Sequence, residues 1–235
     1  MKSRRHLAAS AVILELAQLC PGLTLDTSSL LLSEAIADEG DAMTHPDTPP
    51  PPATTQTPAD AQSVVDFWNE AGEALWFGKD PGFDARFRAR FLTLHEAATR
   101  GELARWTSTA DGALALVILL DQFPRNAFRG TPRMYATDAM ARDVADAAIA
   151  NGYDRIVSTD LQAFFYLPFG HSEDLADQER AVTLCQRLGP RHVAFAEHHR
   201  DIVRRFGRFP HRNAILGRIS TPEEQQYLDN GGYAG

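Results

Sequence analysis

The run GALALVILL, from Gly112 to Leu120, constrains the fold more than any other stretch because it is apolar on every side. Such a run predicts an element that is buried on all faces, which is either a central helix or an interior strand. Neighbouring segments have helical spacing, and no alternating or hairpin pattern occurs elsewhere in the chain. We therefore expect a central buried helix inside an α-helical domain.

A polar cluster follows this run directly, at Asp121, Gln122, Arg125 and Asn126, with Pro124 in its middle. Proline has no amide hydrogen and disfavours helical geometry at the residue before it, so the helix is expected to end just before Pro124. The sequence thus predicts charged side chains at the end of the buried helix.

The rest of the folded part carries the start and stop signals of helices. Asp80 is expected to cap one helix, Ser172 is expected to cap a helix over 173–188, and Thr221 with Glu224 forms a T-x-x-E capping box. No segment predicts a strand. Because consecutive helices with short connections favour antiparallel neighbours, the expected fold is all-α, a single domain of stacked antiparallel helical hairpins.

The N-terminal quarter of the chain differs in kind and ends in PDTPPPPATTQTP, a run that predicts an extended linker. We interpret residues 1–58 as a disordered or mis-assigned extension, with Met43 as an alternative start, and residues 59–235 as the helical domain. The apolar stretch from Leu7 to Leu19 contains Glu15, lacks a clear cleavage site and is too short to cross a bilayer. Export and a transmembrane segment are therefore disfavoured.

The net charge and the cysteine content indicate which classes of binding partner and which cellular compartment to expect. The formal net charge of -8 argues against binding to nucleic acid, which is normally driven by neutralising phosphates with Lys and Arg. Cys20 and Cys185 stand far apart, without the spacing of a metal site or a disulfide framework, which is typical of a reducing cytosol. We expect a soluble cytoplasmic protein with no nucleic-acid or membrane partner.

The segment from His198 to Glu224 holds six arginines and three histidines, the densest set of chemically capable side chains in the chain. His199 falls on the apolar stripe of a predicted helix, so its side chain should face the core. One interpretation is a general base, His199 or His211, oriented by Asp201 or Asp121. The other is that a core-facing histidine is simply hydrogen-bonded to a carboxylate or carbonyl, which is the commoner case.

Arginines in this segment and at the end of the buried helix also suggest an anion site, since a guanidinium offers planar donors to a carboxylate or phosphate. The candidate ligand-binding residues are Arg125, Asn126, His171, Glu173, Arg200, Arg212, Asn213 and Arg218. The alternative is that these arginines pair internally with carboxylates and fix helix packing without a ligand.

A metal centre is not indicated, because the histidines and acids lack a compact spacing such as H-E-x-x-H. The residues with suitable ligand atoms are His171, Glu173, His199 and His211. We expect neither a metal nor another cofactor.

One short motif occurs twice: FPRN at 123–126 returns as FPHRN at 209–213. The separation is too large for a single helical-hairpin repeat, so we interpret the pair as reused turn chemistry. We expect the two copies to meet at the centre of the domain.

Four blocks together resemble a known bacterial family. They are ALVILLDQFPRN with FRGT just after it, FFYLPFGHSEDLADQERAV, HRDIVRRFGRFPHRNAILGR and STPEEQQYL. In this order and spacing they are similar to the family catalogued as domain of unknown function 924, over roughly Val64 to Gly235. The resemblance implies a tetratricopeptide-like all-helical fold and implies no activity.

Three functional hypotheses follow from these patterns. The first is binding of an anionic small molecule or an acidic peptide by the arginine and histidine cluster. The alternative is a hydrolase or lyase with a histidine general base oriented by aspartate. A second alternative is a protein-interaction scaffold with an exposed apolar groove.

Overall fold

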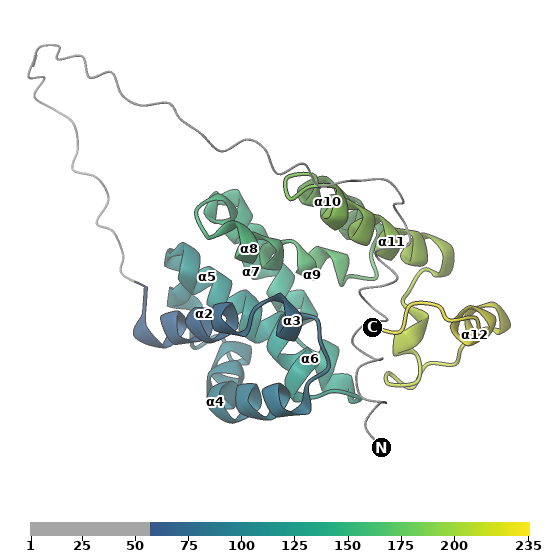
Figure 1. The fold of residues 1–235 in the computed structure, drawn as a ribbon, viewed down its shortest axis with the longest axis horizontal. Helices are drawn as coiled ribbons and strands as arrows, with labels where there is room; N and C mark the ends of the chain where they lie inside the picture. The colour runs from purple at the N-terminus through teal and green to yellow at the C-terminus, as the bar shows by residue number, and fades with distance from the viewer. Residues whose placement is uncertain (1–56) are drawn as a thin grey trace, which may run out of the picture. The chain divides into compact units, whose positions relative to one another are not determined.

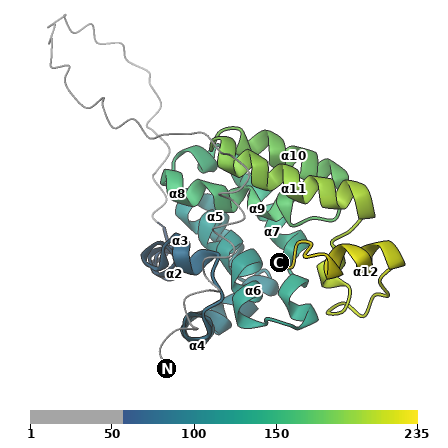
Figure 2. The same cartoon turned by 45° about the vertical axis from the view of Figure 1, so that its right-hand side comes forward.

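The apolar run forms the expected central helix. In the computed structural model, which describes residues 57–235, α5 (Ala110–Val117) is buried from Gly112 to its end. The hydroxyl of Thr109 caps α5 by accepting a hydrogen bond from the Gly112 amide at 3.1 Å. α5 packs against α2 (Ala59–Ala71) and α7 (Asp138–Ala150), so apolar neighbours cover it on more than one side (Figures 1 and 2).

The helix does not end before Pro124, and that prediction is wrong. A π-turn, Ile118–Gln122, follows α5 and leads directly into α6 (Phe123–Ala127). Phe123 itself is helical, with φ -54° and ψ -47°, and its amide donates to the carbonyl of Ile118. The wider turn lets the chain pass Pro124, whose nitrogen carries no hydrogen, without breaking the helix.

Further helices surround this centre. They are α3 (Glu73–Trp76), α4 (Pro81–Thr99), α8 (Thr159–Gln162), α9 (Leu167–Gly170), α10 (Leu175–Cys185), α11 (Pro190–Phe206) and α12 (Pro222–Asp229). α10 and α11 lie side by side in both views as a hairpin (Figures 1 and 2). Short 3₁₀ turns, among them Pro132–Tyr135 and Pro210–Arg212, connect the helices.

Two of the three predicted caps are confirmed. Asp80 accepts a hydrogen bond from the Phe83 amide at 2.6 Å, and Thr221 and Glu224 form the reciprocal capping box of α12. Each cap satisfies amides that have no partner within the helix. Both helices therefore begin where their sequence signals predict.

The third cap prediction is wrong by two residues. Asp174, and not Ser172, caps α10, because the Asp174 carboxylate accepts from the amides of Ala176 and Asp177. The Ser172 hydroxyl instead accepts from the Asp174 amide at 3.1 Å. The helix consequently starts later, and Glu173 lies in the connection before it.

The described residues contain helices and no strand, which confirms the all-α prediction, and they belong to one compact unit. Most buried apolar side chains form one core, and a small second cluster consists of Ile202 and Val203 of α11 together with Phe209. Tetratricopeptide-like stacking stays a prediction. Apart from Thr57 and Pro58, the predicted extension lies outside the described residues. Within residues 57–235 no helix has the length and apolar character needed to cross a membrane.

Candidate functional site

The π-turn determines the position of the Asp121 side chain. Leu119 has no intrahelical donor from residue 124, which is proline, and the Nδ1 of His95 bonds to its carbonyl oxygen at 2.9 Å. The next carbonyl, of Leu120, accepts from the Thr137 hydroxyl, and that of Asp121 accepts from Arg125 at 2.7 Å. Side chains thus stabilise the turn from which the Asp121 carboxylate projects.

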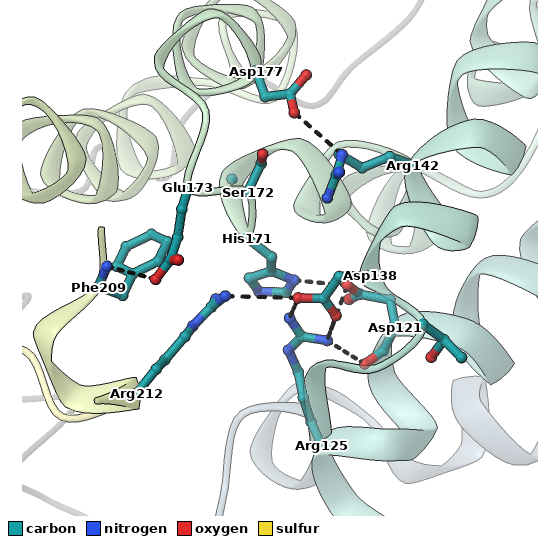
Figure 3. A network of polar contacts seen from close by, with 12 residues as sticks. Asp121, Arg125, Asp138, Arg142, His171, Ser172, Glu173, Asp177, Phe209 and Arg212 are labelled. Carbon is teal, nitrogen blue, oxygen red and sulfur yellow. Dashed lines mark hydrogen bonds and ion pairs between the residues drawn. The ribbon is translucent and has the colours of Figure 1, made fainter. Parts of the chain in front are cut away.

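The Asp121 carboxylate is fully buried and fully engaged. It faces Arg125 at 3.1 Å, accepts from Gln122 at 2.6 Å and bonds to Nδ1 of His171 at 2.9 Å (Figure 3). Burial alone raises the pKa of this carboxyl, but the charge of Arg125 and the hydrogen bonds from His171 and Gln122 outweigh it and lower the pKa to about 2. Asp121 is therefore ionised at neutral pH.

Arg125 joins Asp121 to a second buried acid, Asp138, at the start of α7. Two parallel hydrogen bonds of 2.9 and 3.0 Å connect the guanidinium to the Asp138 carboxylate. Burial lowers the pKa of Arg125, yet Asp121 and Asp138 together raise it above its ordinary value. This bidentate ion pair holds α6 and α7 in one fixed arrangement.

His171 is held as a neutral base. An ionised carboxylate only accepts hydrogen bonds, so Nδ1 of His171 carries the hydrogen shared with Asp121 and Nε2 keeps a free lone pair. Burial, reinforced by the charge of Arg125, lowers the pKa of His171 below 6.5. A buried aspartate that orients a histidine in this way is the arrangement that makes the imidazole a general base.

Arg212 is the least satisfied charge in this region. Its side chain is 8% exposed, its Nε has no hydrogen-bond partner, and its nearest acid, Asp138, is 3.7 Å away. The guanidinium packs over the rings of Tyr135 and Phe209, each 4.5 Å from the ring centre. Burial lowers the pKa of Arg212, and the nearby charge of Arg125 adds to this.

Three of these groups, Asp138, His171 and Arg212, border a cleft of about 600 Å³. Its lining includes His171, Arg212 and Arg142, and apolar surface from Ala139 and Leu216. Arg142 forms an ion pair of 3.2 Å with Asp177 at the rim (Figure 3). The cleft therefore combines two guanidinium groups with a histidine base.

Glu173 closes one side of the cleft. It forms two hydrogen bonds with Arg218, of 2.6 and 2.9 Å, and accepts from the Phe209 amide at 2.8 Å. Burial raises its pKa, but the hydrogen bonds from Arg218 and Phe209 outweigh this and the pKa is lowered. Glu173 and Arg218 thus tie the start of α10 to the segment after α11.

The two copies of the repeated motif meet at Asp138, which both Arg125 and Arg212 approach. Their asparagines point elsewhere. Asn126 donates to Asp84 and joins α6 to α4, whereas Asn213 donates to Glu224 in the first turn of α12. The arginines of the motif lie at the candidate site and the asparagines do not.

The remaining candidates lie away from the cleft. His199 bonds to the carbonyl of Phe195 at 2.9 Å, while Asp201 is exposed beside Arg200 and Arg204. The expected pairing of His199 with Asp201 is not formed, and Asp121 bonds to His171 instead. Arg200 contacts surface carboxylates on and beside α11.

His199 and His211 form a separate aromatic cluster with Tyr233. Their ring centres are 4.6 and 5.1 Å from the Tyr233 ring. Burial is the main cause that lowers the pKa of each to about 3, so both are neutral. Within residues 57–235 no group of three or more His, Cys, Asp or Glu side chains could hold a metal ion.

Sequence reasoning missed Asp138, Tyr135 and Arg142. Asp138 and Arg142 are four residues apart, which places them on one face of α7, but this spacing is also that of an ordinary solvated helix face. Tyr135 lies in a 3₁₀ turn beside the FRGT block, which carried no chemical signal.

Comparison with known proteins identifies the family of this chain but indicates no biochemical activity. The model of the family described as "Bacterial protein of unknown function (DUF924)" matches residues 64–232, so the chain belongs to this family. The chain is also similar to a solved structure, the protein of unknown function ATU0120 from Agrobacterium tumefaciens. Identity is 58%, with a TM-score of 0.73, covering 75% of this chain and 100% of that one. No curated protein matches.

Proposed function

We propose that this member of the DUF924 family binds an anionic small molecule in the cleft, with Arg212 as the residue that holds the acid group. The carrying observation is a guanidinium that is 8% exposed, borders the cleft and has no hydrogen bond within the described residues, only the ion pair of 3.7 Å with Asp138. A buried charge without hydrogen bonds destabilises a protein, and an anion in the cleft would supply them.

The surroundings of Arg212 favour recognition over a structural role. Tyr135 and Phe209 pack against the flat face of the guanidinium, which leaves its edge for planar, two-pronged contact with a carboxylate or phosphate. Arg125 and Arg218, in contrast, each have a carboxylate held by two hydrogen bonds. A volume of about 600 Å³ is in the range of small-molecule sites.

Thermal unfolding with inorganic phosphate or succinate as probe tests this proposal. A ligand that binds only the folded state raises the melting temperature as its concentration rises. We expect this rise for the wild-type protein and its loss in Arg212→Gln, which should fold with equal or greater stability because it removes an unsatisfied charge. Arg205→Gln is the matched control, since Arg205 is exposed and pairs with Glu223. Unfolding of Arg212→Gln, or an unchanged ligand effect, would contradict the proposal.

A second candidate function is general-base catalysis by His171. The observation that favours it is the 2.9 Å contact between His171 and the buried Asp121, which leaves Nε2 as a free base in a cleft-lining residue. In a hydrolysis, Nε2 would take a proton from water while the water oxygen bonds to the acyl carbon, and would return that proton to the leaving group. In a lyase, Nε2 would take a proton from carbon, the C–H electron pair would form a carbon–carbon double bond, and the group on the neighbouring carbon would leave with its bonding pair.

Hydrolysis of 4-nitrophenyl acetate tests this second function. Wild-type protein should hydrolyse it faster than His171→Gln by about 10²-fold or more, with a rate that rises with pH and levels off above the lowered pKa of His171. The control His192→Gln changes an exposed histidine of α11 and should leave the rate unchanged. Equal rates for wild type and His171→Gln would exclude His171 as the base.

The scaffold hypothesis receives less support. The exposed large apolar side chains among the described residues are Phe77, Ile156, Leu175 and Ile219, which come from four separate segments. Isolated exposed apolar residues are ordinary on a protein surface.

A further inference from the structure

A second cation of the cleft, Arg142, defines the ligand further. Arg142 projects from α7 and lines the same cleft as Arg212, and the two side chains approach from different sides of His171 (Figure 3). Its ion pair is between Nε and Asp177 at 3.2 Å, with both side chains a little over one quarter exposed. An ion pair of this kind at the surface contributes little to the stability of the fold. Arg142 can therefore contact a ligand at a small cost in free energy.

Helix α7 relates the positions of the two cations. Arg212 approaches Asp138 within 3.7 Å, and Arg142 lies one helical turn beyond Asp138 on the same face. Side chains four residues apart on a helix have Cβ atoms about 5–6 Å apart. Both guanidinium groups therefore lie beside the part of α7 that lines the cleft.

The cleft that holds the two cations also has apolar surface. Ala139 lies between Asp138 and Arg142 in α7, and Ala136 and Leu216 complete this part of the lining. These side chains offer no hydrogen bond and would cover hydrocarbon. A ligand that contacts both cations and this apolar surface has two acid groups joined by a short apolar chain.

The acids of the cleft do not compete for these positions. Glu173 is bound to Arg218 and to the Phe209 amide, Asp174 caps α10, and Asp138 is bound to Arg125. Each carboxylate already has hydrogen-bond donors of its own. The charges with donors to spare are Arg142 and Arg212.

We propose that the ligand is a short aliphatic dicarboxylate, with one carboxylate on Arg212 and the other on Arg142. This inference rests on the proposed anion binding and adds the identity of the second contact. Because carbon–carbon bonds are about 1.5 Å long, dicarboxylates of roughly four to six carbon atoms place their acid groups at graded separations, and their relative affinities report the separation that the two cations select. A single phosphate at Arg212 would leave both Arg142 and the apolar surface unused.

Titration calorimetry with succinate, glutarate, adipate, propionate and inorganic phosphate tests this inference. We expect at least one dicarboxylate to bind the wild-type protein about tenfold or more tightly than propionate or phosphate, because a second charge-assisted contact is added. Arg142→Gln should weaken that dicarboxylate to the level of propionate and leave propionate unchanged. Arg212→Gln should weaken all five probes. Asp177→Asn is the control, because it frees Arg142 and should retain or tighten dicarboxylate binding.

The outcomes separate the two proposals. If no probe binds in a manner that depends on Arg212, the proposed anion binding fails. If Arg212-dependent binding is present but propionate or phosphate binds as tightly as every dicarboxylate, only the dicarboxylate assignment fails. Equal loss of propionate and dicarboxylate affinity in Arg142→Gln would also overturn it.

Discussion

Asp138 accepts two hydrogen bonds from Arg125 and faces Arg212 at 3.7 Å, so one buried carboxylate meets both arginines of the repeated motif. Its side chain is 10% exposed. Because Arg125 is also enclosed, neither charge can recover hydration if the other is removed. The arrangement is therefore sensitive to single substitutions in a way that a surface ion pair is not.

Replacing Asp138 should unfold the protein more readily than replacing a surface acid of the same cleft. We expect Asp138→Asn to lower the free energy of unfolding by about 3–5 kcal/mol, since it removes the bidentate ion pair of the buried Arg125. Asp177→Asn removes an exposed partner of Arg142 and should cost less than about 1 kcal/mol. Urea denaturation measures both values, and similar losses in the two variants would disprove the structural role of Asp138.

Residue identities within the site were only partly predictable. Asp121, Arg125 and Arg212 stand out because they occur in unusual motifs beside proline. Which histidine meets Asp121 was not predictable, because His171 is 50 residues away and their contact depends on how α9 packs near the π-turn. Asp138 has the same sequence signature as any acid in the first turn of a helix.

At the scale of elements, the π-turn is the feature that sequence patterns do not convey. Periodicity predicts the buried helix, and proline predicts its end. The helical path nevertheless continues past Pro124 because side chains replace the missing backbone hydrogen bonds. His95 donates to the carbonyl of Leu119 and is itself only 3% exposed. A helix interrupted in this way requires a donor from another element, which only the packed structure supplies.

His95→Phe tests this account of the π-turn. Phenylalanine keeps the ring that stacks on Phe123 at 4.8 Å but has no donor, so the Leu119 carbonyl would be buried without a partner. We expect a loss of about 1–3 kcal/mol in the free energy of unfolding, measured by urea denaturation. His95→Gln keeps a donor and should recover part of the loss. A His95→Phe variant as stable as the wild type would show that the contact is dispensable.

Over the whole molecule, the site lies where the main core meets the small cluster around Phe209. Asp121, Asp138 and His171 belong to elements of the main core, whereas Arg212 and Arg218 follow Phe209. The contacts of Glu173 with Arg218 and with the Phe209 amide join these two parts. The all-helical class followed from periodicity and caps alone, but this meeting of distant segments depends on tertiary packing.

Acid should destabilise the whole molecule in two steps. The pKa values of His199 and His211 are lowered from 6.5 to about 3, so the unfolded chain binds more protons and stability falls as pH decreases below 6.5. Each histidine contributes up to about 1.4 kcal/mol per pH unit in this window. The Asp121 carboxylate, with a pKa lowered from 3.8 to about 2, contributes stability that is lost below pH 3.8.

Urea denaturation at a series of pH values between 7 and 4 measures the first step. His199→Phe should show a shallower fall of stability with acid than the wild type, because one buried neutral histidine is removed. The exposed His192 provides the control, since His192→Gln should leave the slope unchanged. Identical slopes in wild type and His199→Phe would mean that His199 is protonated in the folded protein.

The central claim, that Arg212 holds an acid group in the cleft, is tested most directly by NMR of the arginine side chains. The Nε of Arg212 has no hydrogen-bond partner in the structure. Its Nε–H resonance can be assigned because it should be missing from the spectrum of Arg212→Gln. Titration with succinate should shift this resonance in a saturable manner, while that of the exposed Arg205 stays constant. A saturating succinate titration that leaves the Arg212 resonance unmoved would contradict the claim.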